Sequence, residues 1–157
     1  MARGVEIERK FLLARTPDEL PAGEPIEQGY LAIADDGTEV RVRMTPTAAT
    51  LTVKSGDGGV RAEEELALDE RQAEALWALT EGRRLVKTRR RVHDDGAEIE
   101  VDEYGGALEG LVVAEVEFDD EEASRAFEPP SWFAREVTDD PRYSNRSLAT
   151  DGLPGGA

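Results

Sequence analysis

Cysteine is absent from this chain of 157 residues, and so are long apolar runs. Without cysteine the chain forms no disulfide and offers no thiolate to a metal, which fits a reducing compartment. No stretch reaches the roughly 20 apolar residues of a membrane-spanning helix, and the first residues lack the apolar segment of a secretory signal. These absences predict a soluble cytoplasmic protein with no membrane partner.

Positive charge is also scarce, since 19 Lys and Arg face 35 Asp and Glu for a net charge of −16. A nucleic-acid surface would need a basic footprint, so we expect no nucleic-acid partner. A small anionic ligand still fits if the basic residues gather in one place. The length predicts a single domain over 1–157 with its core at about 4–150 and a disordered tail at 152–157, as a monomer or homodimer.

Short alternating runs between turn residues predict a mainly β protein of the α+β class with a few helices. One helix is expected over 69–82, where Asp69 is a good N-cap and Gly82 a good C-cap, and a second over 119–127. A short strand and a helix capped by Ser144 are expected in the last segment. The main strands are expected at 5–13, 28–34, 38–44, 49–55, 60–69, 84–92, 97–104 and 111–118.

One face of these strands is almost purely ionic and is sorted by sign, because side chains alternate across a strand. The simplest interpretation is an apolar face on a core and a charged face in water, but solvated faces usually mix charges with Ser, Thr and Gln. The basic positions are Lys10, Arg41, Arg43, Lys54, Lys87, Arg89 and Arg91, and the acidic ones are Glu6, Glu8, Glu63, Glu65, Glu100, Asp102, Glu115 and Glu117.

A closed eight-stranded antiparallel β-barrel accounts for this pattern if its ionic faces point into a polar lumen and its apolar faces pack outward against the helices. Like charges lining a lumen repel each other, so the basic wall needs a polyanion and the acidic wall needs divalent cations. Ligands that are all oxygen suit Mg²⁺ or Mn²⁺. A single metal ion, or salt bridges with a purely structural role, are the alternatives.

The segment Glu6–Lys10 resembles the E-x-E-x-K signature of the CYTH superfamily, the triphosphate tunnel metalloenzymes. Further motifs follow in that family's order, and the resemblance covers roughly residues 4–150. Within this superfamily the chain is similar to the short, single-domain bacterial members. The further motifs are GYL (29–31), VRVR (40–43), LTVKS (51–55), R-x-E-x-E (61–65), KTR (87–89), EVD (100–102), AEVEF (114–118) and EVTDDPRYSN (136–145).

This resemblance implies an enzyme that hydrolyses inorganic tripolyphosphate to pyrophosphate and phosphate inside a charged eight-stranded tunnel, with a small triphosphate as its partner. Other activities on the same fold are those of class IV adenylyl cyclases and of thiamine or nucleoside triphosphatases. A non-catalytic module that binds polyphosphate is the alternative from a different class.

The resemblance also implies a role for each ionic position. Lys10 and Tyr30 match a catalytic Lys–Tyr pair, and Lys10 also faces the substrate. Arg142, Tyr143 and Asn145 match a segment that covers the tunnel, with either a structural or a substrate-contacting role. Two ions, Mg²⁺ or Mn²⁺, would be held by Glu6, Glu8, Glu115 and Glu117 and by Glu63, Glu65, Glu100 and Asp102, and phosphate oxygens by Arg41, Arg43, Lys54, Lys87, Arg89 and Arg91.

Overall fold

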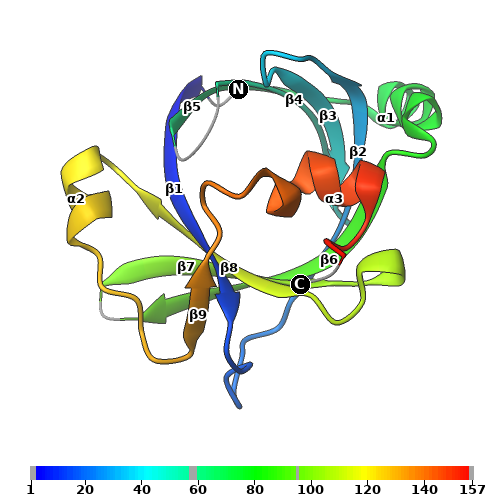
Figure 1. Cartoon of the computed structure of the whole chain (residues 1–157). Coiled ribbons are helices and arrows are strands. Elements are labelled where there is room, and N and C mark those ends of the chain that lie inside the picture. The colour runs from blue at the N-terminus through cyan, green and yellow to red at the C-terminus, as the bar shows by residue number, and fades with distance from the viewer. Residues whose placement is uncertain (1–2, 57–59, 95, 156–157) are drawn as a thin grey trace.

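A closed antiparallel β-barrel forms the centre of the computed structural model, which describes residues 3–56, 60–94 and 96–155 but not the side chains of 3–6 and 60. The strands pair in the order β5-β4-β3-β2-β6-β7-β8-β1, and β5 also pairs with β1, which closes the ring (Figure 1). They are β1 (Arg3–Leu13), β2 (Glu24–Ile33), β3 (Glu39–Met44), β4 (Ala49–Ser55), β5 (Val60–Ala67), β6 (Arg84–Asp94), β7 (Ala97–Tyr104) and β8 (Val112–Phe118).

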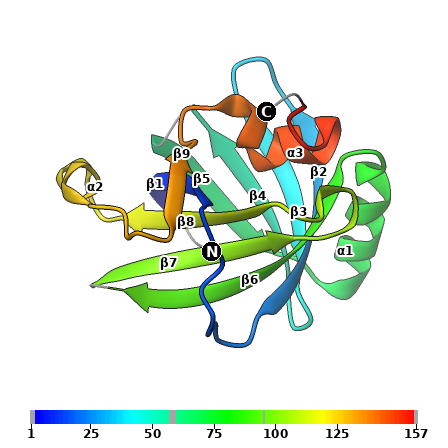
Figure 2. The same cartoon turned by 60° about the horizontal axis from the view of Figure 1, so that its bottom comes forward.

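The closed eight-stranded barrel predicted from the sequence is therefore confirmed. A ninth strand, β9 (Phe133–Glu136), pairs with the last residues of β1, Phe11 and Leu13, beyond the stretch Arg3–Ile7 that pairs with β5 (Figure 2). No described helix is long and apolar enough to cross a membrane.

The described part of the chain has three α-helices around the barrel or at its end. Asp69 caps α1 (Glu70–Trp77) through a capping box with Gln72. The helix is shorter than predicted, because the chain tightens into the 3₁₀ helix η1 (Ala78–Thr80) before Gly82. Ser144 caps α3 (Asn145–Asp151) as predicted. Beyond α3 the described chain to Gly155 has no helix or strand, and 156–157 lie outside the described residues. The remaining helices are α2 (Glu121–Ala126) and the 3₁₀ helices η2 (Gly106–Leu108) and η3 (Pro141–Tyr143).

The larger apolar core lies outside the barrel. Alternation along the strands turns Phe11, Ile99 and Val116 away from the ionic face, and they pack against β9 and the chain around α2. Phe127 and Trp132 cover this outer core. Burying such side chains supplies most of the favourable free energy of folding, so the barrel is stabilised from outside and its interior is left for charged groups.

We expect Ile99→Val to lower the free energy of unfolding by about 0.5–1.5 kcal/mol, the usual loss for one buried methylene. Ile99 is fully buried in the outer core and points away from the lumen. Chemical denaturation measures the loss. An unchanged free energy of unfolding would contradict the close packing of Ile99 in this core.

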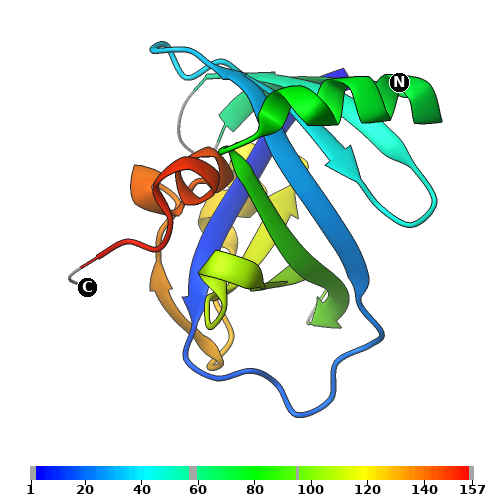
Figure 3. The ribbon, with the colours of Figure 1, turned by 90° about the vertical axis from the view of Figure 1, so that its right-hand side faces the viewer.

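A second apolar cluster closes one end of the barrel. It joins Leu148 of α3 to Leu85, Tyr104 and Val113, which belong to the inward face of their strands. Figure 3 shows α3 lying at one end of the barrel rather than along its outer wall. The polar lumen therefore occupies only part of the length of the barrel.

Candidate functional site

A cavity of about 730 Å³ occupies the polar part of the lumen. Nearly all the strands that surround it contribute ionic side chains, and α3 and the segment between β9 and α3 contribute the rest. Its wall includes the basic residues Lys10, Arg41, Arg43, Lys54, Arg61, Arg89, Arg91 and Arg146, and the acidic residues Glu8, Glu39, Glu63, Glu65, Glu100, Glu115 and Glu117.

Six of the seven basic residues predicted for phosphate binding line this cavity. Lys10, Arg41, Lys54 and Arg89 are buried, although the burial of a charge is costly unless it is paired. Burial, with Arg41 and Arg89 nearby, lowers the pKa of Arg43 to about 10. The basic side chains of a strongly acidic chain are thus gathered at one cavity.

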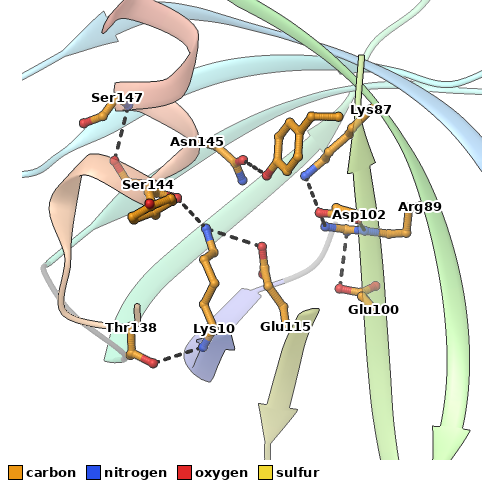
Figure 4. Close-up of polar contacts among 12 residues, drawn as sticks. Lys10, Lys87, Arg89, Glu100, Asp102, Glu115, Thr138, Ser144, Asn145 and Ser147 are labelled. Atoms are coloured by element: carbon orange, nitrogen blue, oxygen red, sulfur yellow. Dashed lines mark hydrogen bonds and ion pairs between the residues drawn. The ribbon is translucent and has the colours of Figure 1, made fainter. Parts of the chain in front are cut away.

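The seventh, Lys87, lies behind the wall with Asp102. Arg89 forms a bidentate pair with Asp102, with Nε–Oδ1 and Nη2–Oδ2 both at 2.8 Å, and Lys87 Nζ is 2.8 Å from Oδ2 (Figure 4). Neither Lys87 nor Asp102 borders the cavity described above. Asp102, predicted as a metal ligand, instead has both oxygens engaged by cations.

The pKa values of this triad reflect two cations that share one carboxylate. Burial favours the neutral acid, but Lys87 and Arg89 outweigh it and hold the pKa of Asp102 below its usual value. Burial lowers the pKa of Lys87 to about 7, because the loss of hydration outweighs the attraction of Asp102, and the positive charges of Arg89 and Arg43 lower it further. Asp102 therefore anchors Arg89 at the cavity wall.

The predicted acidic residues other than Asp102 and Glu6 all line the cavity. Strand register places Glu115 opposite Lys10 and Glu117 opposite Glu8. Glu115 is buried, its Oε1 accepts no hydrogen bond from the described side chains, and Lys10 Nζ lies 3.6 Å from that oxygen. Burial alone would raise the pKa of Glu115, but Lys10 and Arg89 hold it well below the usual range. The side chain of Glu6 lies outside the described residues.

These acidic residues fit a hard divalent cation. Their donors are all carboxylate oxygens, and no described residue donates a hydrogen bond to the buried Oε1 of Glu115. Among the described side chains no three acidic groups form a ready-made metal cluster. Mg²⁺ usually takes only one or two carboxylates and completes its shell with water and phosphate oxygens, so the lack of a three-carboxylate cluster does not conflict with this fit.

The segment between β9 and α3 is hydrogen-bonded to β1 at the edge of the site. Lys10 Nζ donates to the carbonyl of Tyr143 at 3.0 Å, and the backbone N–H of Lys10 donates to Thr138 Oγ1 at 3.0 Å. The hydroxyl of Tyr104 donates to the side-chain oxygen of Asn145, which ties α3 to β7. Arg142 is exposed and pairs with Asp140 at 2.7 Å. Of the three predicted residues of this segment, Tyr143 and Asn145 border the cavity and Arg142 does not.

Tyr30 and Lys10, the predicted catalytic pair, both border the cavity. Tyr30 is fully buried, and its hydroxyl accepts a hydrogen bond from Gln28 Nε2 at 2.8 Å. Burial and the nearby Glu39 raise the pKa of Tyr30 to about 12, so its hydroxyl stays protonated. Within the described part of the chain no hydrogen bond joins Lys10 to Tyr30; Lys10 contacts Tyr143 and Glu115 instead.

Several residues of the site had no predicted role. Buried Glu39 accepts from Arg61 at 3.0 Å and lies 3.4 Å from Arg146 of α3. Arg61 and Gln28 share the inward parity of Glu63 and Tyr30, which was a usable signal. The contact with Arg146 joins segments that are distant in sequence, so no local pattern pointed to it.

Comparisons with known proteins agree with this barrel and its charged lumen. The CYTH domain family matches residues 4–151. The inorganic triphosphatase of Nitrosomonas europaea is 47% identical over 145 residues, which is 92% of this chain and 96% of the relative. The inorganic triphosphatase of Acetivibrio thermocellus is 40% identical over 148 residues, 92% of this chain and 93% of that one. The chain belongs to the CYTH domain family.

Solved structures show the same fold. The crystal structure of the inorganic triphosphatase NE1496 has a TM-score of 0.71 and 45% identity, covering 95% of this chain and 97% of that one. A putative adenylate cyclase from Bacillus halodurans has a TM-score of 0.60 at 18% identity, covering 80% and 86%. The second likeness extends to the fold alone.

Proposed function

We propose that this protein is an inorganic triphosphatase, a metal-dependent hydrolase that splits tripolyphosphate into pyrophosphate and phosphate. The observation that carries the proposal is a single cavity whose wall brings many basic and many acidic side chains together, the basic ones mostly from β3, β4 and β6 and the acidic ones mostly from β5, β7 and β8. The proposal is supported by two relatives named inorganic triphosphatase, at 47% and 40% identity. A module that only binds polyphosphate would have little use for the acidic wall.

The basic wall would bind and orient the substrate. Arg41, Arg43 and Arg89 offer planar forks that match phosphate oxygens, whereas Lys54 is a point charge. Arg89 is already fixed by Asp102, so little conformational freedom is lost when it binds a phosphate. Lys87 would act through this anchor rather than by direct contact.

The acidic wall would hold two ions, Mg²⁺ or Mn²⁺. Glu8, Glu115 and Glu117, with Glu6, would hold one, and Glu63, Glu65 and Glu100 the other. When bound, such ions neutralise phosphate oxygens and lower the pKa of a water molecule. Glu115 stays ionised because Lys10 and Arg89 hold its pKa low, so it is ready to bind a cation at neutral pH.

Lys10 and Tyr30 would stabilise the charge that develops as the terminal phosphoryl group leaves pyrophosphate. Phosphoryl transfer requires positioning and charge neutralisation more than covalent chemistry. The Nζ of Lys10 and the protonated hydroxyl of Tyr30 are both hydrogen-bond donors at the cavity wall. No covalent intermediate is needed, since water can attack the terminal phosphorus.

Phosphate release tests this function directly. We expect fast release from tripolyphosphate with Mg²⁺ or Mn²⁺, none with EDTA, and much slower release from ATP and thiamine triphosphate. Release without metal would refute the metal dependence. A faster reaction with ATP that yields cyclic AMP would assign the chain to the cyclases, and tight tripolyphosphate binding without turnover would make it a binding module.

A further inference from the structure

Gln28 is a buried polar residue on the inner face of β2 to which the proposed function gives no role. Its side chain is completely enclosed, at 0% exposure. An amide in such a place destabilises the fold unless its donors and acceptor are bonded. Two hydrogen bonds satisfy it, one to Arg43 and one to Tyr30.

Arg43 fixes the orientation of the amide. Its Nε–H lies 2.9 Å from Gln28 Oε1, and a guanidinium can only donate. The atom facing Arg43 must therefore be the amide oxygen, and the other end must be the NH₂ group. That assignment follows from chemistry, although the two ends of an amide are otherwise hard to distinguish.

The same assignment fixes the role of Tyr30. The amide NH₂ lies 2.8 Å from the Tyr30 hydroxyl and can only donate to it. The hydroxyl oxygen is thus an acceptor in this bond, and its own proton points elsewhere. Tyr30 is completely buried but is among the residues that line the cavity, so an acceptor bound against it there can take that proton.

We propose that Gln28 is a positioning residue that, together with Arg43, makes the Tyr30 hydroxyl a hydrogen-bond donor to an oxygen of the bound triphosphate. This inference rests on the proposed function. Gln28 touches no substrate itself and acts through Tyr30.

A double-mutant cycle with Gln28→Glu and Tyr30→Phe tests the proposal. The new carboxylate has nearly the same shape and keeps the bond to Arg43, but it accepts the Tyr30 proton. We expect kcat for tripolyphosphate to fall on the order of 10²-fold with KM changed less than about threefold, the loss typical of one transition-state donor. In the Tyr30→Phe background the same change should cost less than about threefold, because the two residues act as a unit.

Equal losses in both backgrounds would overturn the proposal, since a charge effect or a general structural role needs no tyrosine hydroxyl. Gln28→Met is the second variant and introduces no charge; we expect it to lower kcat about tenfold in the wild type and not at all beside Tyr30→Phe. Additive losses there would also refute the proposal. An inactive wild type would overturn the proposed function, and this assignment with it, whereas an active wild type with additive losses would overturn this assignment alone.

Discussion

Asp102→Asn will lower the free energy of unfolding by about 3–5 kcal/mol, because removing one partner of a buried ion pair leaves its charge uncompensated. Here two cations lose their partner, since Arg89 and Lys87 both bind Asp102 at 2.8 Å. For a chain of this size each kcal/mol corresponds to about 2–4 °C in the melting temperature. Chemical denaturation and thermal melting measure the loss.

The loss will depend on pH in a defined direction. In the wild type the pKa of Lys87 is about 7, and without the carboxylate it falls further. Between that lower pKa and pH 7, Lys87 loses its proton when the variant folds but keeps it when the wild type folds. Stability rises with pH wherever the unfolded state binds more protons, so the variant will be closer to the wild type at pH 8 than at pH 5.5.

Glu103→Gln is the matched control for Asp102→Asn. Glu103 is the next residue of β7, faces outward and pairs with Arg90 at 2.9 Å near the surface. Exposed pairs contribute about 0–1 kcal/mol, so this variant should melt close to the wild type. Adding Lys87→Met to Asp102→Asn should recover part of the loss, and the absence of any recovery would contradict a charge imbalance as its cause.

Glu115→Gln will lower kcat/KM for tripolyphosphate at least about 100-fold, since even outer-shell changes at metal sites cost 10–100-fold. The change keeps the shape of the side chain but removes the charge that Lys10 and Arg89 hold ionised. Part of the activity should return at raised Mg²⁺ or Mn²⁺, because the remaining carboxylates still bind the ion more weakly. Phosphate release over a metal titration gives both quantities.

The control for Glu115→Gln is Glu98→Gln, in the exposed pair with His93. It removes the same charge outside the cavity and should leave the metal titration unchanged. If Glu115→Gln shows wild-type activity and metal dependence, Glu115 holds no ion. If it loses activity with no shift in the metal titration, its contact with Lys10 is the relevant interaction.

Alternation along the strands was sufficient to predict the ionic lumen. Positions such as Arg41, Lys54 and Glu63 needed only a period of two and the sign of their charge, and the structure places all three at the cavity. The apolar outer face followed from the same parity, as Ile99 and Val116 confirm. This alternation is a local property of each strand, and the fold keeps it because the apolar face of the strand packs outward.

The two-residue alternation does not tell at which depth along the barrel axis an inward-facing residue lies. Tyr104 and Asp102 share the parity of Glu100, yet Asp102 is sequestered by cations and Tyr104 belongs to the apolar cluster that closes one end. Which inward residue meets which depends on strand register and on α3, whose contacts join distant parts of the chain. The sequence therefore predicted correctly which side chains point into the barrel, but it predicted only some of their contacts.

The position of β1 in the ring has a consequence for the order of folding. β1 pairs with β5 and β8 in the ring and with β9 through its last residues, so Lys10 meets Glu115 across most of the chain. During synthesis β1 is made long before the strands with which it pairs. Pairings so distant in sequence form slowly, in milliseconds to seconds for β-barrels of high contact order. The apolar side chain of Phe11 stays exposed until these strands have paired. Ring closure, and with it the ability to retain a triphosphate, is therefore among the last events of folding.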